Sequence, residues 1–353
     1  MTIPSEPVGS RRGTPTLISL PLRHGTEAFL AKDWRRTLRH DPVAPPVASR
    51  NQALALKARR DLQDEDVDLR RIWTEDRAER LLRRQRPSGG WRYPGGNPKI
   101  RSGEDYDQIE TFRSLGELVE KYAFTREHPA VEKACEFLLS HQTEEGDIRG
   151  ILGHQYAPYY TAAMLELMIK AGYRDDSRVE RGFSWLASMR QDDGGWALPL
   201  RTRDLKLNVI WMNKPTVEPL RSKPSSHLVT GMVLRAYAAH QVHRRSQVAL
   251  DAARFLCSRI LERDYYPDRG DPSFWTGFSY PFWFTDLVSA TDSLSLLGLS
   301  RDEPKIVEGL AWLAERQGPD GTWDLRLLRG RDKDTRLWVS YAVARVFKRF
   351  YAG

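Results

Sequence analysis

Five stretches of the sequence combine aromatic rings with a few carboxylate and imidazole side chains. They run over residues 104–111, 153–161, 225–230, 279–286 and 335–341. Aromatic faces attract cations, so a cavity rich in such rings and poor in carboxylates suits a polyisoprenoid chain that reacts through carbocations. A plain aromatic core would use the same residues, and this alternative stays open. The candidate binding residues are His154, Tyr156, Tyr159, Tyr160, His227, Tyr280, Trp283, Phe284, Trp338 and Tyr341.

These side chains meet only if the chain brings the starts of five helices together. The segments that follow them are apolar on nearly every face, which is typical of buried helices. Between them lie amphipathic segments that begin with capping or acidic residues, as helix N-termini prefer. The expected inner helices cover 107–122, 159–173, 227–241, 285–299 and 335–350, and the clearest outer helices cover 128–138, 175–186 and 300–313.

The outer segments end in a repeated stop that contains Gln, then Gly, then Trp. Four copies occur, at 80–91, 133–148, 181–196 and 308–323. A degenerate fifth copy has Leu261 at the Gln position and Tyr265 near the Trp position. The copies lie roughly 50–70 residues apart, which leaves room for two helices in each unit.

The alternation of helices predicts an all-α fold, an (α/α)6 toroid of inner and outer helices. One more pair, at 26–40 and 51–63, brings the count to about six of each. We expect residues 1–24 to form a disordered basic leader and residues 25–353 to form one toroid domain. A long excursion at 198–224 could be a lid, a partner surface or a solvated loop.

The net charge of +8 fits a nucleic acid, an anionic membrane surface, an acidic substrate or simply solvated helix faces. The sequence has no zinc-knuckle, helix-turn-helix or RNP motif, so we expect no nucleic-acid partner. The two cysteines, Cys135 and Cys257, lack metal-ligand spacing and predict buried thiols in a reducing, cytoplasmic setting. We expect no cofactor and no metal, and peripheral contact with a membrane surface stays an option.

The repeated stop resembles the QW repeat of squalene–hopene cyclases and their relatives. That repeat reads Arg/Lys-Gly-x-x-Trp/Phe-Leu, then Gln, then Gly-x-Trp. Residues 181–196 match it nearly position by position, and residues 308–323 match it with Glu308 in place of the basic residue. The resemblance runs from about residue 80 to the C-terminus. It implies the prenyltransferase/squalene-cyclase toroid, with the Gln–Trp segments acting as clasps between outer helices.

The same resemblance implies a proton donor at the start of an inner helix, in an Asp-x-Asp-Asp-Thr motif. Asp105 and Asp107 match its first and middle positions, while Gln108 replaces its last Asp. By resemblance Asp107 would be the acid, and Asp286 is the second candidate. A zinc site built from Asp286, His227 and His154 would lack the cysteine that protein prenyltransferases use.

Three functions follow as alternatives. The first is a terpenoid-cyclase-like protein that binds a hydrophobic prenyl chain and cyclises it after protonation. The second is a non-catalytic toroid that binds a lipid or a peptide. The third is a carbohydrate-active α/α-barrel enzyme, in which Asp107 and Asp286 would form the carboxylate pair. The sequence leaves the substrate and the oligomeric state open.

Overall fold

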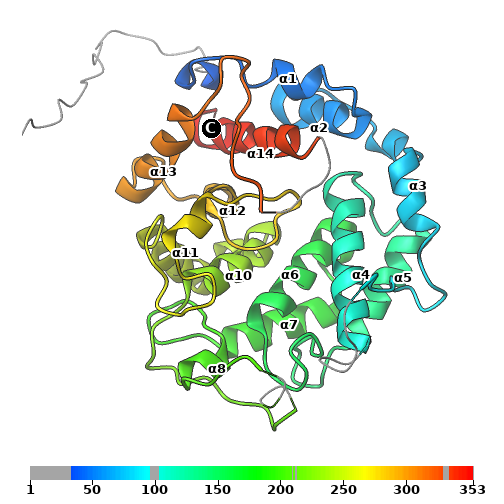
Figure 1. Cartoon of the computed structure of the whole chain (residues 1–353), viewed down its shortest axis with the longest axis vertical. Helices are drawn as coiled ribbons and strands as arrows, with labels where there is room; N and C mark the ends of the chain where they lie inside the picture. The colour runs from blue at the N-terminus through cyan, green and yellow to red at the C-terminus, as the bar shows by residue number, and fades with distance from the viewer. Residues whose placement is uncertain (1–32, 96–102, 209, 211–212, 329–333, 353) are drawn as a thin grey trace, which may run out of the picture. The chain divides into compact units, whose positions relative to one another are not determined.

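The computed structural model describes residues 33–95, 103–208, 210, 213–328 and 334–352, with the backbone alone for 103–105. The predicted leader and its boundary at residue 25 lie outside these ranges. Within them the chain forms helices, turns and isolated bridges, and no extended strand. The predicted all-α fold is confirmed, and the helices form an inner and an outer layer of an α/α toroid (Figure 1).

The inner helices are the more apolar set, as the sequence predicts. In α10, every residue from His227 to Ala238 is buried. Each inner helix from α4 to α14 packs on the next one along the chain, and α14 packs on α2. The inner helices are α2 (Gln52–Gln63), α4 (Gly103–Glu120), α6 (Pro158–Met168), α10 (His227–Ala239), α12 (Leu287–Leu296) and α14 (Thr335–Tyr351).

The outer helices bury one face each. In α7 the buried Val179, Phe183 and Leu186 recur at the spacing of one helix stripe. The Asp176 side chain caps its N-terminus by accepting the Arg178 N–H at 2.8 Å. The outer helices are α1 (Ala44–Val47), α3 (Asp76–Leu82), α5 (Pro129–Leu139), α7 (Ser177–Ser188), α11 (Gln247–Ser258) and α13 (Pro304–Glu315). Shorter elements are η1 (Trp34–Thr37), η2 (Leu69–Ile72), η3 (Ile169–Tyr173), α8 (Pro199–Thr202), η4 (His243–Arg245) and η5 (Pro272–Thr276).

Each repeated stop forms a turn that follows an outer helix and runs from the Gln position to the Trp position. This turn is called a clasp below. The closing position donates its backbone N–H to a hydroxyl on the following inner helix. The closing Trp is buried and donates its indole N–H to a carbonyl of the outer helix that it ends. The backbone pairs are Trp91–Thr111, Ile148–Thr161, Trp196–Thr230 and Trp323–Ser340, at 2.9–3.1 Å. The indole pairs are Trp91–Leu81, Trp196–Leu186 and Trp323–Leu313, at 2.6–2.8 Å.

The Gln of a clasp ties one outer helix to the next. The Gln142 amide donates to the Gly146 carbonyl at 2.9 Å and to the Arg178 carbonyl of α7 at 2.8 Å. Gly146 has a φ of 110°, and a Cβ there would lie 2.5 Å from the Arg181 carbonyl oxygen. Only glycine fits both the left-handed backbone and this close approach.

The last clasp closes the ring of helices. The Gln317 amide donates to the His40 carbonyl at 2.9 Å, and the His40 N–H donates to the Gln317 amide oxygen at 3.0 Å. A Cβ on Gly321 would lie 2.0 Å from the Asp41 carbonyl oxygen. The segment before α1 therefore docks onto the turn after α13, which joins the two ends of the described toroid.

The degenerate copy differs from the sequence-based expectation. Tyr265, expected near the Trp position, is 58% exposed. Trp275 is buried in its place and donates its indole N–H to the Glu262 carbonyl at 2.9 Å. An insertion between the helix and the closing Trp hides this copy from a fixed-offset search.

In the clasp after α7, the Gln side chain is hydrogen-bonded to the excursion at 198–224 and not to the next outer helix. The Gln191 amide donates to the carbonyls of Leu220 and Lys223 at 2.8 and 2.9 Å. The Gln155 amide donates to the carbonyls of Lys214 and Pro215. The described part of the excursion is thus fastened to the ring at two points.

Replacing Trp323 by Ala should lower the free energy of unfolding by about 3–5 kcal/mol, because a buried indole and its hydrogen bond are lost together. Trp312, half-buried on α13, is the matched control, and Trp312→Ala should cost about 1 kcal/mol. Urea unfolding of both variants measures the difference. Equal losses would remove the clasp role assigned to Trp323.

Candidate functional site

A cavity of about 670 Å³ lies among the inner helices and is called the inner cavity below. Its walls come from α4, the C-terminal half of α6, α10, the start of α14 and the loop before α12. Its volume is in the range of pockets that hold small organic ligands. The lining residues are Arg77, Phe112, Arg113, Gly116, Glu117, Glu120, Lys121, Glu166, Leu167, Arg235, Ser279, Tyr280, Pro281, Phe282, Trp283 and Thr335.

One wall of the inner cavity is aromatic. The rings of Phe112 and Trp283 lie 5.3 Å apart, and the Arg113 guanidinium lies 4.9 Å from the Trp283 ring. Behind this wall, Tyr280 stacks on Trp338 with centroids 5.1 Å apart and planes 5° from parallel. Of the predicted binding residues, Tyr280 and Trp283 therefore face the inner cavity, and Trp338 supports Tyr280 from within the core.

Charged side chains line the rest of the inner cavity, and Arg235 among them donates to the Trp283 carbonyl at 3.3 Å. Arg235 donates to Glu166 at 2.8 Å, and both side chains are buried. Lys170 forms ion pairs with Glu166 at 2.7 Å and with Glu120. Burial acts to raise the pKa of Glu120, but Lys170 and Lys57 outweigh it, and the pKa is lowered. Glu120 therefore stays ionised, because the charges of Lys170 and Lys57 offset its burial.

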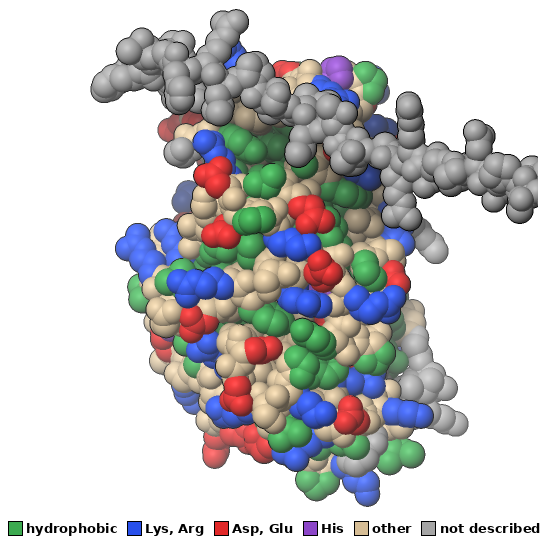
Figure 2. Space-filling model, turned by 90° about the vertical axis from the view of Figure 1, so that its left-hand side faces the viewer, with side chains coloured by type: hydrophobic (Ala, Val, Ile, Leu, Met, Phe, Trp, Pro, Cys, Tyr) green, Lys and Arg blue, Asp and Glu red, His purple; other side chains and the backbone are tan. Residues whose placement is uncertain are grey.

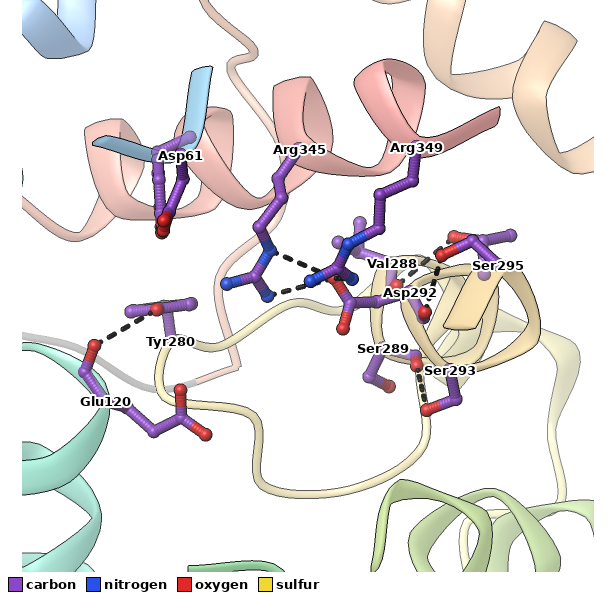
Figure 3. A network of polar contacts seen from close by, with 12 residues as sticks. Asp61, Glu120, Tyr280, Val288, Ser289, Asp292, Ser293, Ser295, Arg345 and Arg349 are labelled. Carbon is purple, nitrogen blue, oxygen red and sulfur yellow. Dashed lines mark hydrogen bonds and ion pairs between the residues drawn. The ribbon is translucent and has the colours of Figure 1, made fainter. Parts of the chain in front are cut away.

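A polar network continues between α12 and α14 (Figure 3). Asp292 accepts hydrogen bonds on a single oxygen from Arg345 at 2.9 and 3.1 Å and from Arg349 at 2.7 Å. Burial favours the protonated acid, but the two guanidinium groups lower the pKa of Asp292 to about 2. Tyr280 donates its hydroxyl to the Glu120 carbonyl at 3.3 Å, and Tyr341 donates to Asp61.

These charged side chains were missed at the sequence level, although the sequence carries a signal for them. Glu166, Arg235 and Asp292 are each the lone Asp, Glu, Lys or Arg of an apolar inner helix, and Arg345 is the lone charge in the apolar run 337–347. A charge in such a run is rarely buried without a partner. Charges of opposite sign on helices that become neighbours predict the pairs that form.

Asp107 lies at the side of the clasp that follows α3. It accepts the Arg86 guanidinium at 2.7 Å and the Tyr93 backbone N–H at 2.9 Å. Among the described residues, it is not part of the lining of the inner cavity. The Asp105 side chain lies outside the described part of the chain.

Asp286 is the N-cap of α12. It accepts the Ser289 N–H at 2.8 Å, and its own N–H donates to the Ser289 hydroxyl at 2.9 Å, which completes a capping box. Burial raises the pKa of Asp286 to about 7, against the opposing effects of the Ser289 hydrogen bonds and the Arg235 charge. This carboxyl group is therefore partly protonated near neutral pH, where an exposed aspartate is ionised.

Tyr159, Tyr160 and Phe284 line a second hollow of about 370 Å³, near the starts of α6 and α10. Tyr159 and Tyr160 pack with centroids 4.4 Å apart. Phe284 lies under the Arg269 guanidinium, 4.0 Å from its ring. The structure thus distributes the predicted constellation over two hollows and the core around them.

Five predicted binding residues line neither hollow: Trp338 and Tyr341 in the core, and Tyr156, His227 and His154. Tyr156 is buried and donates its hydroxyl to Glu145 at 2.6 Å and to Glu218 at 3.2 Å. His227 is buried against the Trp275 ring, and burial lowers its pKa to about 4, so the imidazole is neutral. His154 is exposed.

Glu180, His240 and His243 bring three potential metal ligands within 4.8 Å of one another. The Nδ1 atom of His240 accepts the backbone N–H groups of Val242 and His243 at 3.3 and 3.2 Å. The hydrogen therefore sits on Nε2, which faces the Arg174 carbonyl at 3.1 Å. Metal binding through Nε2 needs the opposite tautomer, so the arrangement favours hydrogen bonds over a metal.

The family described as the squalene-hopene cyclase C-terminal domain matches residues 105–202 and 174–335. A squalene–hopene cyclase of Bradyrhizobium diazoefficiens is 26% identical over 150 residues, which is 42% of this chain and 21% of that protein. The match thus spans about a fifth of the length of this relative.

Two solved structures are similar in fold at low identity. Type II terpene cyclase MstE from Scytonema, as a variant bound to geranylgeranyl dihydroxybenzoate, has a TM-score of 0.41 and 13% identity over 88% of this chain and 85% of its own. A polysaccharide lyase has a TM-score of 0.37 and 12% identity over 69% of this chain and 72% of its own. In the described part of the chain, no helix is both long and apolar enough to span a bilayer.

Asp286 should make stability fall as pH rises. Its pKa is about 7 in the folded protein against 3.8 as a free side chain, so between these values the folded state binds more protons than the unfolded one. The free energy of unfolding should then decrease by up to about 1.4 kcal/mol per pH unit from this group.

Asp286→Asn keeps the cap and removes the titration, so its unfolding free energy should fall less steeply than that of the native protein. Asp271→Asn, at the exposed cap of η5, is the control and should keep the native slope. Urea unfolding between pH 4 and 7 provides the comparison. Parallel curves for the native protein and Asp286→Asn would contradict the assignment.

Proposed function

The chain belongs to the family of the squalene–hopene cyclase C-terminal domain, and from that premise we propose that it binds a prenyl chain in the inner cavity. As a member of this family, it is a terpenoid-cyclase-like protein. The observation that carries the proposal is the aromatic wall of Phe112, Tyr280 and Trp283 along a cavity of about 670 Å³. An apolar chain that packs on these rings is removed from water, which is favourable, and it loses no polar contact in doing so.

The geometry favours a ligand with two different faces. Aromatic rings stabilise a positive charge on a bound chain by about 0.5–2 kcal/mol each. The charged side chains beside this aromatic wall, with Arg235 and Glu166 paired at 2.8 Å, can accept a polar end group without separating their own charges. A prenyl chain that carries a polar head fits this division better than a pure hydrocarbon does.

Cyclisation of such a chain would begin with a proton from a carboxylic acid. Neither candidate aspartate, Asp107 nor Asp286, lines the inner cavity. Asp286 is the better candidate of the two, because burial raises its pKa to about 7 and the acid form is populated near neutral pH. It follows Trp283 and Phe284 in the loop that supplies the aromatic wall. Asp107 is held by the Arg86 guanidinium at 2.7 Å and by the Tyr93 backbone N–H at 2.9 Å, outside the lining of the inner cavity.

A second candidate function is binding without catalysis. Gln108 stands where the family motif has its last Asp, and Asp107 is engaged by Arg86 and Tyr93. These contacts give Asp107 a structural role in the clasp after α3. In this alternative the inner cavity holds a prenyl compound or lipid, and Asp286 only caps α12.

Trp283→Ala should weaken the binding of geranylgeraniol by about tenfold, since an aromatic face and its apolar area are lost together. Tyr265→Ala is the control, because Tyr265 is exposed and lies outside the inner cavity. Quenching of tryptophan fluorescence gives both affinities. Equal affinities of the two variants would place the ligand elsewhere.

The two functions separate in a product assay. The protein is incubated with squalene and with prenyl compounds that carry polar heads, and cyclic products are sought by mass spectrometry. Catalysis predicts products that disappear in Asp286→Asn, with geranylgeraniol affinity retained. Binding in the native protein without any cyclic product would favour the non-catalytic alternative, and products that Asp286→Asn leaves unchanged would exclude Asp286 as the acid.

A further inference from the structure

An open cleft of about 900 Å³ lies where α2, α12 and α14 end, beside η4. It is called the basic cleft below. On the face of the protein in Figure 2, Lys and Arg side chains lie among Asp and Glu side chains. The basic cleft differs from that pattern, because positive side chains dominate its walls. Its cations are Arg60, Arg244, Arg245, Arg345, Lys348 and Arg349.

The charges in the basic cleft do not cancel. Two carboxylates, Asp61 and Asp64, belong to its lining, and Asp292 lies behind it. Six cations against these three carboxylates leave an excess of three positive charges. Within the described ranges, Arg244 and Arg245 form no ion pair, so their guanidinium groups are available to a ligand.

Part of the basic cleft is held in a fixed geometry. Arg345 and Arg349 meet on one oxygen of Asp292, and a single carboxylate cannot neutralise two guanidinium groups (Figure 3). Arg345 also lies over the Tyr341 ring at 5.4 Å. Holding these side chains in place before a ligand arrives lowers the entropy cost of binding.

The arrangement of the donor groups in the basic cleft indicates the chemical class of its ligand. Guanidinium groups present planar forks of N–H donors that match phosphate oxygens. Leu250, Leu296 and Leu297 add an apolar strip to the same cleft. We propose that the basic cleft binds an organic phosphate, a monoester or a diphosphate, with its phosphate oxygens against the arginines and its organic part against the leucines. This site is separate from the inner cavity and does not depend on the function proposed for it.

Inorganic diphosphate is the probe for the phosphate subsite. Titration calorimetry on the full chain should show one saturable site. Arg244→Gln with Arg245→Gln should weaken binding at least about tenfold, the effect of losing charge-assisted hydrogen bonds. Both side chains lie outside the buried network, so the double variant should melt like the native protein.

The matched control is Arg254→Gln with Arg263→Gln, two arginines that are 69% and 72% exposed and lie outside the basic cleft. It removes the same net charge and should keep the native affinity within about twofold. Arg349→Gln tests the fixed pair, and should weaken binding while circular dichroism shows an intact fold. Absence of saturable binding, native affinity in the cleft variant, or equal weakening in the control would overturn the proposal.

A phosphate group can come from a soluble ester or from a lipid headgroup. Cosedimentation with phosphatidylcholine vesicles, with and without phosphatidic acid, distinguishes them. Binding that requires phosphatidic acid and is displaced by diphosphate identifies a lipid headgroup as the source. Diphosphate binding without vesicle binding identifies a soluble ester, and vesicle binding that the cleft variant retains would contradict a lipid role for the basic cleft.

Discussion

In three of the four regular clasps, a buried indole N–H donates to a carbonyl of its own outer helix, and these turns of the ring depend on that bond. It fixes where the chain turns, and the backbone N–H at the same position then reaches a hydroxyl on the next inner helix, as Trp196 reaches Thr230 at 2.9 Å. Gln then ties the turn to the following unit. Gln317 is hydrogen-bonded to His40 in the same way. The kind of contact that joins successive units of the toroid therefore also joins its two ends.

A closed ring creates a buried centre, and this chain places charges there. Buried without a partner, Glu166 or Arg235 would each destabilise the fold, but neighbouring inner helices bring the two side chains within 2.8 Å of each other. The inner cavity also has an aromatic wall, and its Trp283 carbonyl accepts a hydrogen bond from Arg235. The ring thus brings an aromatic surface and charged side chains to one cavity.

The sequence was a good guide wherever a repeat carried the information. Matching Gln, Gly and Trp offsets predicted the layers and the clasps, because the same bonds recur in each copy. The closing role of Trp275 was not predicted, because an insertion places this residue away from the offset that the other copies share. The site was harder: the Asp107 position at a helix start was predicted, but its partner Arg86 comes from the preceding unit. The burial that raises the pKa of Asp286 depends on packing between helices far apart in the sequence.

The most direct test of this account is a crystal structure of the protein with geranylgeraniol bound. The account predicts density for the chain along Phe112 and Trp283, with its hydroxyl end toward Arg235 and Glu166. Side chains that close the inner cavity, or a ligand in the hollow of Tyr159, Tyr160 and Phe284 instead, would contradict it.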